Sequence, residues 1–331
     1  MTRASTPAPS TNSMPPKAIP PNRDRLQSQI LVWIGTPILL YLTEATLQWI
    51  IPLSGRFIAY TGRTDDTLTR VIVVSFIFAV AAWRLRAATP LAAACGGMIC
   101  FLITAFSQGR AGSSVFHSDL APLLLLFILT LGATRLGRVR KAAAGLTESR
   151  QGRNAAQVIA NLGVAALFSS IPGGFIAGWI NGGIGTCQCD VGHYMGLFVL
   201  PTLAALAEAT ADTVSSEIGQ AFGGTPFMLT TLRRVPPGTD GAISLYGTLA
   251  GIAAAALIAA TGAPTLGMSP TECFVAFAAG VAGLFFDSLL GATIERKGWI
   301  GNDLVNFAST AFAAAVALLA IRFGQDTSCT N

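Results

Sequence analysis

Acidic and hydroxyl side chains recur at helical spacing near the end of an apolar stretch in the last third of the chain. In the segment AEATADTVSSEIGQAFGG, Glu208 and Asp212 are one helical turn apart. The same face continues through Ser215, Ser216 and Gly219. Because an acid at the centre of a membrane helix costs about 2.5 to 3.5 kcal/mol, the pattern predicts a compensating bound cation, aqueous cleft or proton relay. An interfacial acid in plain water is the alternative.

A second group of polar residues follows in the segments FFDSLLGATIERKGW and GNDLVNF. In the first segment, Asp287 and Glu295 share one helical face. In the second, Asn302 or Asp303 is suited to cap a helix, and Asn306 lies on the same side one turn later. Helix starts bind anions through unpaired amides and the positive end of the dipole. The segment therefore predicts an anion site, with helix capping alone as the alternative.

A basic, glycine-containing loop, TTLRRVPPGTDGAISLYGTLAG, lies between these two groups. It contains Arg233 and a second arginine, a Pro-Pro turn, and then Gly238 and Gly241 before a helix, with Asp240 or Thr239 as the expected helix cap. The loop lacks the Gly-Lys-Ser/Thr of a Walker A motif. It predicts a phosphate cradle, with an ordinary basic loop beside the membrane as the alternative.

Taken together, the three segments contain hard oxygen ligands suited to Mg²⁺, guanidinium groups and helix N-termini. Phosphoryl transfer requires this set of groups, because the protein mainly positions the phosphates and neutralises their charge. We therefore interpret the last third of the chain as a candidate phosphoryl-transfer site.

The composition indicates that these segments belong to a membrane protein. Hydrophobic residues make up 52% of the 331 residues and charged residues only 11%, whereas soluble domains carry about 25% charged residues. Recurrent apolar stretches predict an all-α polytopic membrane bundle of about nine transmembrane helices. The expected spans are residues 30–53, 70–84, 88–107, 119–134, 155–178, 192–212, 241–261, 272–291 and 303–322. The short 70–84 span could instead be re-entrant.

Basic loops predict the orientation in the membrane. The basic residues between the fourth and fifth spans are Arg135, Arg138, Arg140, Lys141, Arg150 and Arg153. By contrast, the connections 181–191 and 262–271 contain no Lys or Arg. Because basic loops stay in the cytoplasm, we expect the N-terminus inside and the C-terminus outside a bacterial inner membrane. A plastid membrane is the alternative.

The chain is expected to form one membrane domain with a short tail. Residues 1–26, rich in Pro, Ser and Thr, predict a disordered cytoplasmic tail, with a transit peptide as the alternative. Residues 27–325 form the single polytopic domain. The net charge of +5 is explained by the basic loops, so the lipid bilayer is the expected partner and nothing supports nucleic-acid binding. The pattern makes no prediction of oligomeric state.

Three motifs closely resemble one integral membrane family. They are DTVSSEIGQAFG, TTLRRVPPGTDGAISLYGTLAG and SLLGATIERKGWIGNDLVN, and TRLGRVRKAAAGLTESRQGRNAAQVIANLG is similar to the basic loop and following helix of the same family. The family is that of the phytyl-phosphate kinases, whose bacterial members are often catalogued as domain of unknown function ninety-two. The family-like core covers about residues 131–322. Gln220 and Gly301 stand where relatives commonly have a basic residue and Asn.

The resemblance implies transfer of a phosphate from a nucleoside triphosphate, CTP or ATP, to a prenyl monophosphate such as phytyl phosphate. Asp212, Glu217 and Asp303 are implied to hold one or two Mg²⁺ ions on the nucleotide. Arg233 is implied to neutralise the transferring group. The expected phosphate-binding and substrate-binding residues are Ser216, Gly238, Gly241, Asn302 and Asn306, joined on helix geometry alone by Asp287 and Glu208.

Two other functions fit part of the pattern. A proton-coupled transporter could use Glu44, Glu208, Asp212 and Asp287 as a relay. The polar residues favour one face over the bilayer midplane, and no inverted repeat is visible, so an enzyme is favoured. A CTP-using lipid-phosphate cytidylyltransferase would also require Mg²⁺ and a lipid phosphate, and it is the second alternative.

Overall fold

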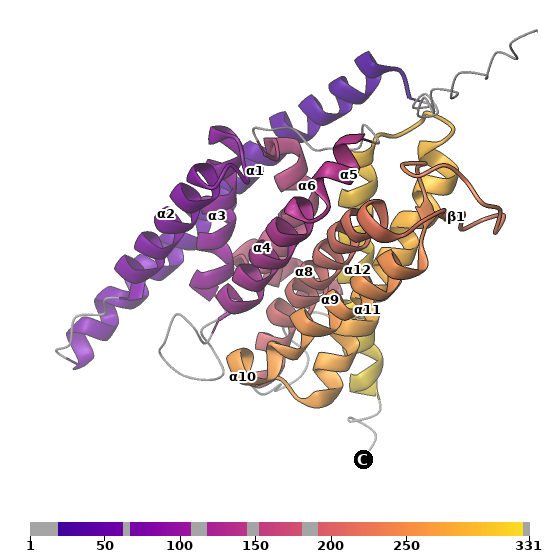
Figure 1. The fold of residues 1–331 in the computed structure, drawn as a ribbon. Helices are drawn as coiled ribbons and strands as arrows, with labels where there is room; N and C mark the ends of the chain where they lie inside the picture. Colours follow the sequence, from indigo (N-terminus) through magenta and orange to yellow (C-terminus); the bar gives the residue numbers. More distant parts are fainter. Residues whose placement is uncertain (1–18, 62–66, 107–117, 144–151, 181–190, 327–331) are drawn as a thin grey trace, which may run out of the picture.

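The chain folds into a bundle of helices with one short β-hairpin at one end (Figure 1). The computed structural model describes residues 19–61, 67–106, 118–143, 152–180 and 191–326. The helices of the first half are α1 (Pro21–Thr61), α2 (Thr67–Arg84), α3 (Pro90–Phe106), α4 (Leu120–Arg135), α5 (Arg138–Ala143), α6 (Ala155–Phe168) and α7 (Ile171–Ile180). The second half contains α8 (Val191–Phe222), β1 (Phe227–Met228), β2 (Ala242–Ile243), α9 (Leu245–Ala260), α10 (Gly262–Leu266), α11 (Pro270–Leu290), the π-helical turn η1 (Gly291–Glu295) and α12 (Asn302–Asp326).

Helix α8 lies at the centre of the bundle, where it packs against α4, α6, α9, α11 and α12. Its middle turns consist of small and aliphatic residues, and Leu203, Ala204 and Leu206 are fully buried. Small residues let neighbouring helices approach closely. At Gly251 on α9, an added Cβ would lie 2.7 Å from the carbonyl oxygen of Ala211. This close packing fixes the position of α8 and therefore the positions of the acidic residues along it.

The helices agree with the prediction of a membrane protein. The expected number of nine transmembrane spans is not confirmed. Within the described residues, four helical stretches are long and apolar enough to cross a membrane: Pro21–Gln48, Leu245–Leu266, Pro270–Glu295 and Asn302–Arg322. Shorter apolar helices cover Pro90–Ala105, Leu120–Arg135 and Ala155–Phe168. The structure thus supports an all-α membrane protein without establishing nine crossings.

Two expected spans differ in shape from the helices observed. The span expected at 155–178 is divided into α6 and α7, because the chain turns at Ser169 and Ser170. The span expected to end at residue 212 continues as α8 to Phe222. A prediction from hydropathy ends a span where polar residues begin. The helix itself can continue when those residues face a polar cavity. Helix α1 already begins at Pro21, and residues 1–18 of the expected tail lie outside the described residues.

The connection from α8 to α9 folds over one end of the bundle as an antiparallel β-hairpin. Helix α9 is capped by Ser244, whose Oγ accepts a hydrogen bond from the backbone N–H of Gly247 at 3.2 Å. The expectation that Thr239 or Asp240 would cap this helix is therefore wrong. Strand β2 intervenes between the glycine-containing turn and the helix, so the cap falls later in the chain.

Candidate functional site

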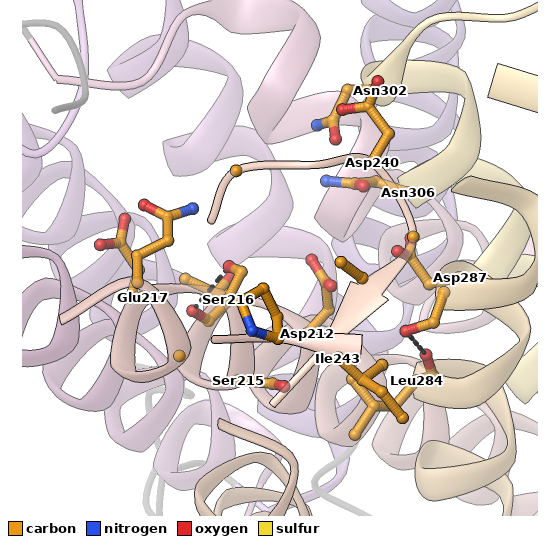
Figure 2. A pocket seen from close by; sticks show the side chains of 18 of the residues that line it. Asp212, Ser215, Ser216, Glu217, Asp240, Ile243, Leu284, Asp287, Asn302 and Asn306 are labelled. Atoms are coloured by element: carbon orange, nitrogen blue, oxygen red, sulfur yellow. Dashed lines mark hydrogen bonds between the residues drawn. The ribbon is translucent and has the colours of Figure 1, made fainter. Parts of the chain in front are cut away.

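A polar cavity of about 300 Å³ lies at the hairpin end of the bundle. Segments of α6, α8, α11, η1 and α12 form its walls together with the loop before β2. Its acidic side chains are Asp212, Glu217, Asp240, Asp287 and Glu295, and its amides are Gln157, Asn161, Gln220, Asn302 and Asn306. Figure 2 shows Asp212, Asp240, Asp287 and Asn306 around this space. Among the described lining residues, Arg153 is the single basic side chain, so the cavity attracts cations.

Asp212 and Arg153 meet where α8 passes the start of α6. Arg153 interacts electrostatically with Asp212, and its Nη2 donates a hydrogen bond to Thr213 Oγ1 at 3.1 Å. The next residue, Asn154, caps α6 by accepting a hydrogen bond from the backbone N–H of Gln157 at 3.0 Å. The capped start of α6 therefore positions Arg153 beside the carboxylate of Asp212.

Two further acids extend from the cavity toward the core. On α11, Asp287 lines the cavity, and its Oδ2 accepts a hydrogen bond from Ser309 Oγ of α12 at 3.2 Å. Glu208 lies one turn before Asp212 on α8, is only 1% exposed and does not line the cavity. Its Oε1 has no hydrogen-bond partner within the described part of the chain. Glu208 is thus a buried neighbour of the site.

Glu217 lines the cavity, but its carboxylate is already engaged. It forms a buried ion pair with Lys141 of α5. The Lys141 ammonium also donates to the carbonyl oxygens of Ala133 at 3.2 Å and Thr134 at 2.9 Å, near the end of α4. This network neutralises Glu217 and fastens α5 to α8, so Glu217 has less capacity to bind a cation than Asp212.

The glycine-containing loop closes one side of the cavity. Gly241 has φ +71°, a conformation that favours glycine. An added Cβ there would lie 2.5 Å from Ala292 Cα and 2.6 Å from the Gly291 carbonyl carbon. The loop backbone therefore rests directly on η1, a close approach that only glycine permits. Gly238 also lines the cavity from this loop.

Asp303 lies outside the cavity lining and faces the start of α1. Its Oδ2 accepts a hydrogen bond from Ser28 Oγ at 2.6 Å. The side chain of Gln27 on α1 binds the loop just before α12. It donates a hydrogen bond to the Trp299 carbonyl oxygen at 2.9 Å and accepts one from the Gly301 N–H at 2.8 Å. Figure 1 shows the start of α1 beside the loop that precedes α12. In this structure Asp303 therefore joins α1 to α12.

Gly301, where the family resemblance led us to expect Asn, lies against the start of α1. A Cβ at Gly301 would meet the end of the Asp24 side chain, so glycine there lets α1 approach without a shift of that carboxylate. Asn302 and Asp303 lie in the first turn of α12 and do not cap it, because the Gly301 carbonyl oxygen accepts the first helical hydrogen bonds. The sequence expectation of an Asn302 or Asp303 cap is therefore wrong, although Asn302 does line the cavity.

The predicted residues thus divide into two groups. Those that line the cavity are Asp212, Ser216, Glu217, Gly238, Gly241, Asp287, Asn302 and Asn306. Those that do not are Glu208, Arg233 and Asp303. Sequence reasoning did not assign site roles to Arg153, Asn161 and Glu295, and it named Asp240 only as a candidate cap of the phosphate-cradle loop. The shared face of Asp287 and Glu295 was a usable signal, whereas Arg153 belongs to a basic loop whose residues otherwise indicate only orientation.

The donor atoms of the cavity fit a metal ion that is shared with a phosphate ligand. Within the described residues, no group of three or more His, Cys, Asp or Glu side chains could hold a metal ion. Mg²⁺ commonly binds one or two carboxylates together with substrate phosphates and water. The carboxylates of Asp212 and Asp287, with the nearby amides, suit this shared coordination. Of the three carboxylates expected to hold the metal, Asp212 and Glu217 line the cavity, whereas Asp303 lies outside it against Ser28.

Fold and cavity define an all-α integral membrane protein with an acidic, oxygen-rich site at one end of its bundle. Residues 73–314 match the family described as integral membrane protein DUF92, and the chain belongs to this family. The match begins well before residue 131, where the recognisable motifs start, so it includes part of α2 and all of α3.

Curated relatives come from a plant, an archaeon and a cyanobacterium. Protein VTE6, chloroplastic, of Arabidopsis thaliana is 28% identical over 293 residues, which cover 82% of this chain and 84% of the relative. An uncharacterized membrane protein of Methanocaldococcus jannaschii is 31% identical, with 77% and 96% covered. An uncharacterized membrane protein of Synechocystis sp. is 30% identical, with 59% and 71% covered. No solved structure matches the chain significantly.

Proposed function

We propose that the chain is a membrane kinase that transfers a phosphate from CTP or ATP to a prenyl monophosphate, such as phytyl phosphate. Membership of the family, and the resemblance of its motifs to the phytyl-phosphate kinases, support this reaction class. The observation that carries the proposal is the acidic cavity around Asp212 and Asp287, to which all three motifs contribute residues.

The cavity supplies the groups that bind a nucleoside triphosphate. Asp212 and Asp287 present carboxylate oxygens for Mg²⁺, which when bound offsets the charge of the phosphates. Asn302 and Asn306 add amide donors at the first turns of α12, where the helix dipole favours an anion. The loop around Gly241 brings backbone close to the same space. These groups orient the triphosphate for transfer.

Arg153 is the residue best placed to neutralise the transferring phosphoryl group. It lines the cavity and interacts with Asp212, whereas Arg233 lies outside the lining. Charge neutralisation and positioning account for most catalysis of phosphoryl transfer. The acceptor is an anionic phosphate oxygen, so no general base is required.

The same reasoning suggests the membrane side of the site. The hairpin end of the bundle also contains the basic residues of α5. Basic loops favour the cytoplasmic side, where nucleotides are available. We place the cavity at the cytoplasmic face of a bacterial inner membrane, or at the equivalent face of a plastid membrane.

The decisive assay incubates the purified protein in detergent with Mg²⁺, γ-labelled CTP or ATP, and phytyl, geranylgeranyl or farnesyl phosphate. We expect label in the lipid diphosphate, and we expect Asp212→Asn to abolish it while the variant still purifies as a folded protein. Glu272→Gln is the matched control, because Glu272 caps α11 through its side chain and glutamine can also cap. Substantial transfer by Asp212→Asn would reject the assignment.

The same assay separates the rival functions. Release of pyrophosphate with a nucleotide-linked lipid would identify a cytidylyltransferase, and uptake into vesicles without transfer would identify a transporter. A relay through Glu44 has little support in the fold, because Glu44 is exposed on α1 and accepts a hydrogen bond from Gln48 at 3.1 Å.

A further inference from the structure

A second cavity, of about 700 Å³, lies beside the first between α2, α3, α4, α5 and α6. Its basic side chains are Arg86, Arg135, Arg138, Lys141 and Arg153. Among the described residues that line it there is no Asp or Glu. Because the first cavity is lined by acids and this one by cations, the two spaces favour ligands of opposite charge.

The two cavities meet at a shared wall. Arg153 and Asn161 line both of them. Arg153 points its guanidinium toward α8, where Nη2 donates to Thr213 Oγ1 at 3.1 Å. A group bound in the second cavity can therefore reach the residue that faces the nucleotide site.

The basic rim of the second cavity is built by specific backbone contacts. The Arg153 N–H donates to the Ala87 carbonyl oxygen at 2.9 Å, and the Thr89 N–H donates to the Arg153 carbonyl oxygen at 3.0 Å. Gly152 has φ +82°, and an added Cβ would lie 2.5 Å from the Arg86 carbonyl oxygen. The segment before α6 is thus joined to the turn between α2 and α3, which brings their arginines to one rim.

Arg86 and Arg138 supply the positive charge that is available to a ligand. Lys141 is committed to Glu217, and Arg135 Nη2 donates to the Leu85 carbonyl oxygen at 2.9 Å. Arg86 and Arg138 are exposed and form no ion pair within the described part of the chain. Arg86 also has φ +55°, a left-handed conformation that is unfavourable for an L-residue. In this conformation the Arg86 side chain lies at the rim of the second cavity.

Behind the basic rim, the cavity is apolar. Its apolar wall is formed by Phe78, Ala82, Leu126, Phe127, Val158 and Leu162. The rings of Phe78 and Phe127 meet edge to face, with their centroids 5.4 Å apart. A volume of this size lies within the range of about 300 to 1,000 Å³ that is typical of small-molecule sites. The cavity therefore suits a ligand with an anionic head and a long hydrocarbon chain.

We propose that this second cavity binds the acceptor, a prenyl monophosphate, with its phosphate at Arg86 and Arg138 and its chain against the apolar wall. The inference rests on the proposed kinase function, which it extends by placing donor and acceptor on opposite sides of Arg153. An anionic oxygen of the acceptor forms the new bond to the γ-phosphorus of the nucleotide. The bond from that phosphorus to the β,γ-bridging oxygen breaks, the nucleoside diphosphate leaves with the electron pair, and no proton is transferred.

The test measures binding of labelled geranylgeranyl phosphate to the purified full chain in detergent without nucleotide. The double variant Arg86→Gln/Arg138→Gln is expected to weaken binding at least about tenfold, or about 1.4 kcal/mol. Arg84→Gln is the matched control, because Arg84 is an exposed arginine at the end of α2 that does not line the cavity. Geranylgeraniol, which lacks the phosphate, should bind equally to the wild type and to these arginine variants.

A second variant tests the apolar wall. Gly96 lines the cavity, and an added Cβ would lie 3.6 Å from the Phe78 ring, so a larger side chain can enter the space. Gly96→Leu should weaken binding of geranylgeranyl phosphate more than binding of the shorter geranyl phosphate. Equal losses for both chain lengths would show that the hydrocarbon chain does not occupy this wall.

The outcomes separate this inference from the kinase proposal. If the wild type transfers phosphate and binds the acceptor, but the double arginine variant binds it normally, the acceptor site lies elsewhere and the kinase stands. If the arginines are required for binding but no nucleotide yields labelled diphosphate, the cavity assignment stands and the kinase proposal fails. Competition by phosphatidate or by inorganic phosphate at equal concentration would overturn the prenyl assignment in favour of a general anionic-lipid or phosphate site.

Discussion

The ion pair between Lys141 and Glu217 allows a quantitative test of how the site is supported. Their side chains are 2% and 9% exposed, so Lys141→Met would leave the Glu217 carboxylate buried without its cation. Removing one partner of a buried pair costs about 3 to 5 kcal/mol. Lys141 also serves two carbonyl oxygens at the end of α4. We therefore expect the free energy of unfolding to fall by at least about 3 kcal/mol.

The double variant Lys141→Met/Glu217→Met should recover part of that loss, because no charge is left unpaired. We expect a recovery of about 2 kcal/mol, since the carbonyl oxygens of α4 still lack their donor. Unfolding by dodecyl sulfate in mixed micelles measures all variants on one scale. Arg138→Gln, a change at an exposed cation of the same helix, should stay within about 0.5 kcal/mol of the wild type. A double variant no more stable than Lys141→Met would refute the reasoning.

Three further predictions concern individual positions. Asp303→Asn and Ser28→Ala should produce equally small changes in phosphate transfer, because the two side chains hydrogen bond to each other outside the cavity; loss of transfer in Asp303→Asn alone would identify a metal ligand. Gly241→Ala should raise the nucleotide KM at least about tenfold because its Cβ would meet η1, whereas Gly224→Ala, with φ +67° but open space around it, should leave the KM unchanged. Equal KM values for the two variants would contradict the contact between Gly241 and η1. Glu208→Gln should raise the free energy of unfolding in dodecyl sulfate titration, because a neutral amide costs less to bury than an acid whose Oε1 lacks a hydrogen-bond partner in the described structure. A lower free energy of unfolding for Glu208→Gln would show that a cation requires that carboxylate.

Much of the helical architecture was predictable from local sequence. The spans expected at 241–261 and 272–291 correspond to α9 and α11, because apolar runs and capping residues act within a few residues of each helix end. Ser269, Pro270 and Glu272 form such a start signal for α11. Asp212 and Ser216 share a helical face, and both line the cavity, as their spacing suggested.

The partners of individual acids were not predictable in the same way. Glu217 pairs with Lys141, which lies 76 positions away, and Asp303 binds Ser28, which lies 275 positions away. Helical periodicity relates residues within one helix only. Which face of a helix meets a cavity, and which meets another helix, depends on how the whole bundle packs.

Composition, apolar periodicity and local motifs were therefore enough to establish a helical membrane protein, its family and a set of candidate acids. Packing of distant helices brought Asp212 and Asp287 to the cavity, paired Glu217 with Lys141 and Asp303 with Ser28, and placed Arg153 between two spaces of opposite charge. The physical reason is that a helix sets its own surface through short-range hydrogen bonds, whereas the environment of that surface arises from contacts between segments far apart in the chain.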